Sequence, residues 1–366
     1  MNRLTIKTPD KRDYDVVFSD SFDGLGEELA RLELTGKKAY IVTDSHVEPL
    51  YASTIEKVLE DSGCSHKTYS FKAGEESKTS DTVNAILDEL IQGKYTRDDI
   101  LLALGGGVVG DVAGYAASMY RRGLNFIQVP TTLLAMVDSS VGGKNGVDYN
   151  GYKNMIGTFY FPKLVYSNLK TLDTLDERQF YNGFAEAMKS ALIRDQHYYE
   201  WQIENMYEIQ DKDYDTLEDL VLKAVTCKKI IVEKDPFESG ERALLNLGHT
   251  IGHAIEKEKM GELMHGECVA LGTVAAAHIS YQKEMLSLDE YLEIRDMFVP
   301  FNLPITIDNI DLEKVCDNIL LDKKNDATGL KFILLKKIGK AVIDRSVTKE
   351  EIVKALKEIE YTDDFE

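Results

Sequence analysis

Two histidines lie four residues apart in the segment GERALLNLGHTIGHAIE, in which Arg242, Asn246, His249 and His253 recur at steps of four, three and four. A helix over this segment would place all four polar side chains on one face, beside an apolar body. Two imidazoles on one helix face can bind the same metal ion or the same substrate. The H-E-x-x-H mechanism of zinc proteases is excluded, because Thr250 stands where that motif requires Glu.

A third imidazole and a carboxylate complete a candidate metal site. His265 stands at the start of a predicted helix, and Glu186 shares one face of a predicted helix over 177–195 with Asn182 and Lys189. A polar stripe of this kind, taken alone, is typical of a solvated surface. Together with the histidines, Glu186, His249 and His265 offer three ligands from three segments. Three protein ligands leave a position open, which is typical of catalytic rather than structural zinc.

A glycine-rich segment suggests nucleotide binding. GGGVVGD at 105–111 follows an apolar strand and begins a predicted helix, so its backbone N–H groups and the helix N-terminus could hold a pyrophosphate. No acidic residue stands about 20 residues downstream to bind a ribose hydroxyl, and Asp44, at the end of an earlier strand, is the alternative. The other interpretation is a glycine turn that serves only tight strand–helix packing.

Hydroxyls, glycines and charged groups are dense between 129 and 154. The stretch VPTTLLAMVDSSVGGKNG contains Asp138 and Lys144, and Lys153 and Asn154 follow shortly. Each residue singly is typical of an ordinary loop, but the combination suits phosphate and polyol contacts.

The elements that must position these residues fall into two halves. β-rich runs at 37–44, 66–74, 98–107 and 124–132 alternate with helical patterns, which predicts a parallel sheet, and the runs 3–7 and 14–18 predict an edge hairpin. From about Leu175 the pattern is helical, except for a strand pair at 331–335 and 341–344. We therefore expect an α/β domain with a Rossmann-like parallel sheet over 1–175, which contains the candidate nucleotide-binding loop, and a mainly α-helical domain over 176–366, which contains the candidate metal ligands.

Composition limits the partners and the compartment. The 366 residues have a net charge of −20, which disfavours nucleic-acid binding, and no apolar run is long enough to span a membrane. The four cysteines are far apart and form no C-x-x-C pair, so a disulfide framework is not expected. The N-terminus lacks the pattern of a secretory signal, and we expect a cytoplasmic protein. An anionic substrate would then need a local cluster of Lys and Arg.

Six motifs, in order and over nearly the whole chain, resemble the 3-dehydroquinate synthase family: GGGVVGD, PTTLLAMVDSSVGGK, KNMIG, NGFAEAMK, LNLGHTIGHAIE and HGE. The resemblance implies a two-domain fold with the substrate, a small sugar phosphate, in the cleft between the domains. It also implies conversion of 3-deoxy-D-arabino-heptulosonate 7-phosphate into 3-dehydroquinate and phosphate, with NAD that is regenerated in each cycle and Zn²⁺ (or Co²⁺). A homodimer is expected from the family alone.

The resemblance also assigns residues. It implies a metal site of Glu186, His249 and His265. NAD contacts are implied for Asp44, Gly74, Glu75, Lys78, Gly106, Gly107, Val108, Gly110, Asp111, Thr131, Thr132, Lys144, Lys153, Thr171 and Thr174. Substrate binding and catalysis are implied for Arg122, Asp138, Lys144, Lys153, Asn154, Lys189, Lys228, Arg242, Asn246 and His253, with Glu238 as a proton acceptor. Lys323 or Lys324 is expected to close the site, and the motif does not choose between them.

The chain departs from the family pattern at two places: His46 stands where Asn is usual, and Pro236 or Phe237 where an acidic residue is usual. Three alternatives remain. Sister cyclases act on glucose 6-phosphate or sedoheptulose 7-phosphate, but the segment DSSVGGK favours the dehydroquinate branch. A metal-dependent polyol dehydrogenase would release NADH, and the many Lys and Arg positions argue against it. A catalytically silent scaffold would have no need of all three metal ligands.

Overall fold

The computed structural model describes residues 2–259, 261–325 and 330–361, of which 321–325 are described by their backbone alone. It divides into two compact units. Unit 1 consists of Met1–Leu175 and Leu217–Phe237, and unit 2 of Asp176–Thr216 and Glu238–Glu366. The units differ from the expected domains by the segment Leu217–Phe237, which belongs by its contacts to unit 1.

Unit 1 is built on a seven-stranded sheet with the strand order β1-β2-β9-β6-β5-β3-β4. Its strands are β1 (Asn2–Ile6), β2 (Tyr14–Ser19), β3 (Lys38–Asp44), β4 (Ser65–Phe71), β5 (Ile100–Gly105), β6 (Asn125–Pro130) and β9 (Leu164–Asn168). β1 and β2 form the predicted antiparallel edge hairpin, and the pairs from β2 to β4 are all parallel. The predicted α/β class with a parallel sheet is thus confirmed. β9 was not predicted from the sequence.

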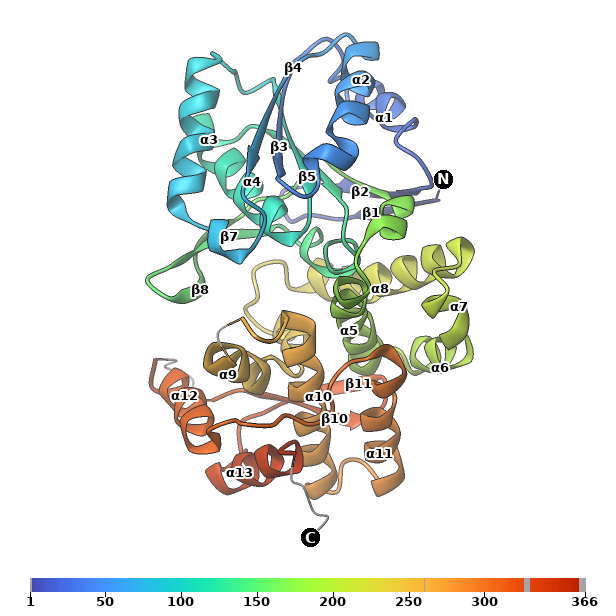
Figure 1. Cartoon of the computed structure of the whole chain (residues 1–366), viewed down its shortest axis with the longest axis vertical. Coiled ribbons are helices and arrows are strands. Elements are labelled where there is room, and N and C mark those ends of the chain that lie inside the picture. Colours follow the sequence, from blue (N-terminus) through green and yellow to red (C-terminus); the bar gives the residue numbers. More distant parts are fainter. Residues whose placement is uncertain (1, 260, 326–329, 362–366) are drawn as a thin grey trace. The chain divides into compact units, whose positions relative to one another are not determined.

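Helices cover both faces of this sheet, which explains why β5 is apolar and buried along its whole length. α1 (Leu25–Arg31) and α2 (Ser53–Asp61) pack in a core on one face, and α3 (Ser80–Gln92) and α4 (Gly107–Met119) pack in a core on the other (Figure 1). α4 lies close to its neighbours because it is rich in Gly and Ala. A Cβ atom at Gly114 would lie 1.8 Å from Asn145 Oδ1.

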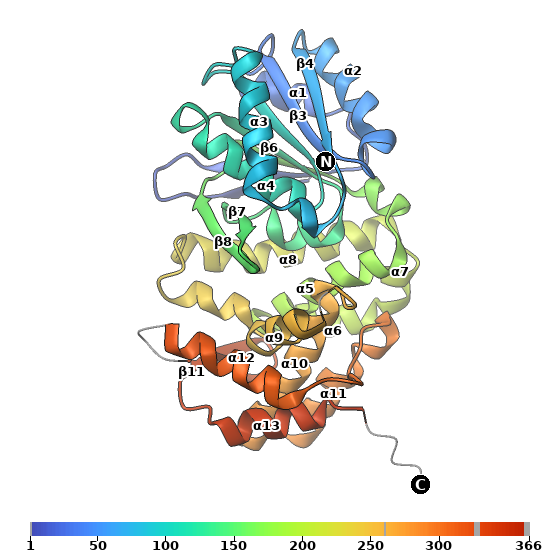
Figure 2. The same cartoon turned by 60° about the vertical axis from the view of Figure 1, so that its left-hand side comes forward.

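Two further elements complete unit 1. The antiparallel hairpin of β7 (Lys144–Tyr149) and β8 (Tyr152–Phe159) packs beside α4 (Figure 2). α8 (Tyr214–Lys234) belongs to this unit for most of its length. Its Glu233 side chain accepts a hydrogen bond from Lys7 N at 2.8 Å, and Lys228 bonds to Asp138. These bonds to the α/β part explain why most of α8 belongs to unit 1, although we expected it in the helical domain over 176–366.

Unit 2 is mainly helical, as predicted. It contains α5 (Glu177–Arg194), α6 (Gln196–Glu204), α7 (Met206–Gln210), α9 (His249–Lys259), α10 (His265–Gln282), α11 (Leu288–Asp296), α12 (Leu312–Asn325) and α13 (Lys349–Glu358). The central helix is α10, which packs against α5, α9, α11 and α13. The predicted strand pair is present as β10 (Phe332–Lys337) and β11 (Lys340–Asp344). None of the described helices is long and apolar enough to cross a membrane.

Candidate active site

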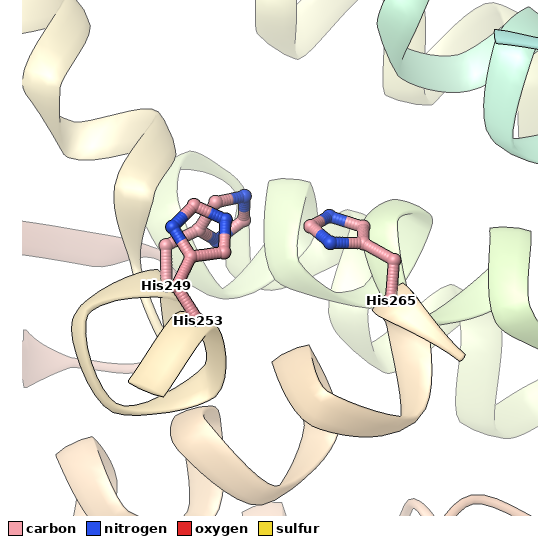
Figure 3. Close-up of side chains that lie close together, drawn as sticks. All are labelled: His249, His253 and His265. Atoms are coloured by element: carbon pink, nitrogen blue, oxygen red, sulfur yellow. The ribbon is translucent and has the colours of Figure 1, made fainter. Parts of the chain in front are cut away.

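Three imidazoles meet where α9 and α10 begin. His249 and His253 lie one turn apart on α9, and His265 is the first residue of α10. One ring nitrogen from each of the three lies within 4.8 Å of the others, and the rings point toward one another (Figure 3). The i, i+4 spacing therefore places both α9 imidazoles on one face, as the sequence predicted, and α10 supplies the third.

The carboxylate of Glu186 lies beside this cluster, although it belongs to a third helix, α5. Its Oε1 atom is 3.7 Å from His249 Nε2 and 3.4 Å from His265 Nε2, and the side chain is 1% exposed. Lys189, one turn further along α5, forms an ion pair with the other carboxylate oxygen. The polar stripe of α5 is therefore buried and not a solvated surface.

A metal ion fits this arrangement. Both carboxylate oxygens of Glu186 are buried; Oε2 is paired with Lys189, whereas Oε1, which faces the imidazoles, accepts no hydrogen bond from any described residue. Leaving a buried carboxylate oxygen without a partner is costly, and a cation between Oε1 and the imidazoles would satisfy it. One carboxylate and neutral imidazoles are ligands that Zn²⁺ prefers. The structure brings four candidate ligands together, and the choice of Glu186, His249 and His265 over His253 stays a prediction.

The protonation states follow from the surroundings. Burial opposes ionisation of Glu186, but Lys189 and the two nearby histidines outweigh it and hold the pKa of Glu186 well below its usual range. Burial, and then Lys189, depress the pKa of His249 well below that of a free imidazole. Burial also opposes protonation of His265, but Glu186 and Glu256 raise the pKa of His265 to about 9. In the metal-free protein His265 therefore carries a proton that a metal ion must displace.

The ring atoms that do not face Glu186 have partners of their own. His249 Nδ1 lies 3.1 Å from the Leu247 carbonyl oxygen, and His265 Nδ1 lies 3.6 Å from Glu256 Oε2. Such partners orient metal-binding imidazoles and favour the tautomer that leaves Nε2 available. The sequence analysis missed Glu256. Its position on α9, three residues after His253, was the signal that could have identified it.

Glycines allow α9 and α10 to pack backbone against backbone. A Cβ atom at Gly272 would lie 1.9 Å from the Gly248 carbonyl oxygen, and one at Gly252 would lie 2.7 Å from the Cys268 carbonyl oxygen. A third close approach joins α10 to α5, where a Cβ at Gly266 would lie 2.0 Å from the Asn182 carbonyl oxygen. We call these three contacts the glycine seam. Because of the glycine seam, main-chain contacts between α5, α9 and α10 determine how the candidate metal ligands on these helices lie relative to one another.

Further predicted residues of unit 2 lie on the segment that precedes α9. Asn246 Nδ2 donates to Glu238 Oε1 at 3.0 Å, and Glu238 has a left-handed backbone with φ of 58°. Arg242 is 2% exposed and lies in the 3₁₀ turn Glu241–Asn246. Lys323 and Lys324 lie in α12, but their side chains lie outside the part that the structure describes.

In unit 1 the predicted NAD residues gather at the carboxyl ends of the parallel strands. Asp44 ends β3, Gly74 and Glu75 follow β4, Gly106 to Asp111 follow β5, Thr131 and Thr132 follow β6, and Thr171 and Thr174 follow β9. The strand order changes direction between β3 and β5, and this switch point is where open α/β sheets bind ligands. The N-cap residue of α4 is Gly106, which has no side chain to accept hydrogen bonds from the first turn. The first N–H groups of α4 are therefore suited to binding an anion.

Two ion pairs connect other predicted residues of unit 1. Lys78, which is 5% exposed, contacts Asp111 Oδ2 at 2.7 Å and donates to Asn154 Oδ1 at 2.6 Å. Burial opposes the charge on Lys78, but Asp111 and then Glu75 outweigh it and raise the lysine pKa. In the second pair, Lys228 Nζ donates to Asp138 Oδ1 at 2.7 Å. The structure therefore joins residues that the resemblance assigns to the cofactor and to the substrate.

Three further predicted residues are exposed. Lys144 and Lys153 lie on the β7–β8 hairpin, and Lys153 Nζ lies 3.9 Å from Glu75 Oε1, the oxygen that also lies 4.0 Å from Lys78 Nζ. Arg122 is exposed just beyond the C-terminal end of α4, at the opposite end of that helix from Gly107. With 1.5 Å per residue this separation along the helix is roughly 20 Å. The structure thus does not bring Arg122 together with the glycine loop of the same chain.

The two departures from the family pattern have simple local roles. His46 donates its backbone N–H to Asp44 Oδ1 at 2.8 Å, and its own ring is not needed for that bond. Phe237 packs edge-to-face on Phe159 of β8, with ring centroids 5.4 Å apart. An aromatic contact within unit 1 therefore stands where the family pattern has an acidic side chain.

Comparison with known proteins identifies the family. Family models described as 3-dehydroquinate synthase N-terminal and 3-dehydroquinate synthase C-terminal match residues 68–182 and 183–325. The chain is 41% identical over 354 residues to a 3-dehydroquinate synthase of Ruminiclostridium cellulolyticum, which covers 97% of this chain and 98% of the relative.

Two solved structures have the same fold. The chain resembles 2-epi-5-epi-valiolone synthase from Streptomyces hygroscopicus subsp. jinggangensis with NAD+ and Zn²⁺ bound, at a TM-score of 0.87 and 27% identity, covering 94% of this chain and 96% of that one. It resembles 2-deoxy-scyllo-inosose synthase complexed with carbaglucose-6-phosphate, NAD+ and Co²⁺ at a TM-score of 0.89 and 26% identity, covering 98% and 100%. Both matched family models and the full-length relative agree with the motifs, and the chain belongs to the 3-dehydroquinate synthase family.

Proposed function

We propose that this protein is a 3-dehydroquinate synthase, which converts 3-deoxy-D-arabino-heptulosonate 7-phosphate into 3-dehydroquinate and phosphate. One observation carries the proposal: three imidazoles cluster together, and two of them, those of His249 and His265, lie against the buried carboxylate of Glu186, in a chain that is 41% identical to a 3-dehydroquinate synthase over 97% of its length. The sister cyclases of known structure are only 26% and 27% identical, which favours the dehydroquinate reaction over theirs.

The reaction needs both kinds of site. In the substrate, a ring hydroxyl is oxidised to a ketone, the neighbouring C–H becomes acidic, phosphate is eliminated, the ketone is reduced again, and the ring opens and closes by an aldol reaction. Bound NAD supplies the oxidation and its reversal without net consumption, and bound zinc or cobalt supplies Lewis acidity at the hydroxyl. We assign the metal to Glu186, His249 and His265. We assign the pyrophosphate of NAD to the N-terminus of α4 and the ribose to Asp44.

The chain's charged side chains supply the rest. Lys189, Lys228 and Arg242 are buried cations, at 2%, 6% and 2% exposure, in a protein of net charge −20. Lys228 belongs to unit 1, and Lys189 and Arg242 belong to unit 2. In each unit they are buried positive charge of the kind that the carboxylate and the phosphate of the substrate require. We assign proton transfer to His253 and Glu238; the position of His253 within the imidazole cluster and the hydrogen bond that Glu238 accepts from Asn246 support this assignment.

The assay is phosphate release from 3-deoxy-D-arabino-heptulosonate 7-phosphate with catalytic amounts of NAD, with and without a chelator, while absorbance reports NADH. We expect phosphate release that the chelator abolishes and no accumulation of NADH. Steady formation of NADH would instead indicate a polyol dehydrogenase. Turnover of glucose 6-phosphate or sedoheptulose 7-phosphate without turnover of the heptulosonate would indicate a sister cyclase.

The proposal includes a cytoplasmic homodimer. All four cysteines are buried thiols, which suits a reducing compartment, and the dimer is supported by the family resemblance alone. Light scattering coupled to size exclusion should give twice the chain mass of 41.2 kDa. A mass of one chain at working concentrations would contradict the dimer without affecting the proposed reaction.

A further inference from the structure

Three residues of α5 face three consecutive residues at the start of α10. Arg178, Asn182 and Glu186 follow one another at steps of four, so they share one face of α5. Their partners run in the opposite order along the chain: Arg178 contacts Glu267, Asn182 contacts Gly266, and Glu186 contacts His265. We call this set of three contacts the α5–α10 ladder.

The outer step of the α5–α10 ladder is a two-point ion pair. Arg178 Nε donates to Glu267 Oε1 at 2.6 Å, and Arg178 Nη2 donates to Glu267 Oε2 at 2.8 Å. Glu267 Oε2 also accepts a hydrogen bond at 2.8 Å from the backbone N–H of Met264, the N-cap residue of α10. A planar guanidinium held at two points fixes orientation as well as distance. Arg178 thereby fixes the first turn of α10, which carries His265.

The middle step leaves no freedom between the two helices. Gly266 N donates to Asn182 Oδ1 at 2.5 Å, and Asn182 is 8% exposed. Any side chain at position 266 would collide with the Asn182 carbonyl oxygen, at 2.0 Å from its Cβ. The middle step therefore determines the register in which α5 and α10 meet, and the register determines whether Glu186 and His265 can reach one metal ion.

We propose that Arg178, Asn182 and Glu267 are positioning residues of the metal centre: they hold the first turn of α10 on α5 so that His265 stands against Glu186. None of the three is among the metal ligands that we assign, so their effect on the metal would pass through the register of two helices. The inference rests on the proposed function, because it takes Glu186 and His265 as metal ligands.

Because the ion pair of Arg178 with Glu267 is partly exposed, its effect on metal binding can be measured separately from its effect on folding stability. The Arg178 side chain is 52% exposed, and ion pairs with an exposed partner contribute little to the free energy of folding. Replacing Arg178 should therefore leave the protein folded. Changes to residues that orient metal ligands typically weaken metal binding by about 10- to 100-fold. A loss of metal affinity without a matching loss of stability is the result that positioning predicts.

The test compares R178M with a control at the other end of the same helix. Lys283 follows α10 and pairs with Glu351 of α13 at 3.1 Å, so K283M also removes one ion pair of α10 but lies far from His265. Zinc affinity is measured by competition with a chromophoric chelator, and thermal unfolding of the metal-free variants gives their stability. We expect R178M to bind zinc about tenfold more weakly, R178K to lie between it and the unchanged protein, and K283M to bind zinc normally.

Each outcome decides a different point. A folded R178M that binds zinc as tightly as the unchanged chain overturns the inference, and so does an equal loss in K283M. If R178M does not fold, R178K decides by the same criterion. A zinc affinity that is insensitive to Glu186→Gln would overturn the proposed metal site itself, and the positioning inference with it, whereas normal sensitivity to Glu186→Gln with no effect of R178M would overturn the positioning inference alone.

Discussion

Glu186→Gln is the most direct test of the metal centre, because the substitution keeps the shape of the side chain and removes its charge. In the structure this carboxylate is 1% exposed, its Oε1 atom faces His249 and His265, and it forms an ion pair with Lys189, which is 2% exposed. The substitution therefore removes one anionic ligand from the metal. It also removes the counter-charge of a buried lysine.

Both effects have a magnitude. Structural zinc sites with four protein ligands bind with about 10–16 kcal/mol, or about 3 kcal/mol a ligand, so losing one ligand should weaken zinc about a hundredfold. Removing one partner of a buried ion pair typically costs about 3–5 kcal/mol. For a unit of this size a loss of about 3 kcal/mol lowers the melting temperature by about 6–12 °C, which should leave the variant folded at assay temperature.

The assay measures zinc by competition with a chelator, NAD by fluorescence titration, and phosphate release. We expect weak zinc binding, NAD binding unchanged within about twofold, and no turnover at stoichiometric zinc. Glu358→Gln is the control for the chemical change itself, since this carboxylate, which is 36% exposed, lies 3.8 Å from another buried histidine, His278, near the other end of α10. Tight zinc binding with full activity in Glu186→Gln would refute the ligand assignment.

Three further predictions address His253, His265 and Lys78. His253→Ala should retain zinc and slow turnover, whereas His249→Ala should lose zinc; equal loss of metal in both would show that the choice between the two α9 histidines is wrong. Since the pKa of His265 is raised to about 9 in the metal-free fold, its contribution to stability is fully present below about pH 6.5 and is lost as the pH rises through about 9. Zinc must displace the same proton, so its affinity should rise from pH 7 to 9 with release of protons on binding, and a pH-independent affinity would contradict this protonation state. Lys78→Met should weaken NAD about tenfold and leave zinc unchanged in titrations, because Lys78 pairs with Asp111 beside the glycine loop; unchanged NAD affinity would place that pair outside the cofactor site.

The sequence predicted those parts of the fold that follow from local periodicity. Alternating apolar strands and helices gave the parallel sheet, and the four-residue step from His249 to His253 gave one helix face with two imidazoles. The turn chemistry around Gly339, whose φ is 76°, gave the β10–β11 pair. These features depend on a few neighbouring residues, which a single sequence displays.

Long-range pairing was not available from the same patterns. β9 is only five residues long, and α8 has ordinary helical periodicity, so neither reveals its partner in the sheet unit. The stripe of Asn182, Glu186 and Lys189 resembles a solvated face, and its burial depends on α10, which lies more than 70 residues away in sequence. The ion pair of Arg178 with Glu267 joins residues 89 positions apart. The sequence analysis offered Glu186 only as a candidate ligand beside the histidines, and the family resemblance then assigned it to the metal.

The glycine seam has a consequence for how this enzyme can change over evolutionary time. In most binding sites single substitutions are absorbed because neighbouring side chains adapt, so a ligand can drift by small steps. At Gly252, Gly266 and Gly272 the nearest atom to an added Cβ is a backbone carbonyl oxygen, at 1.9 to 2.7 Å, so even one added methyl group would force the main chain to move. We therefore expect substitutions during evolution to change the lysines and arginines assigned to the substrate, and with them the specificity, while the position of the imidazole cluster stays the same.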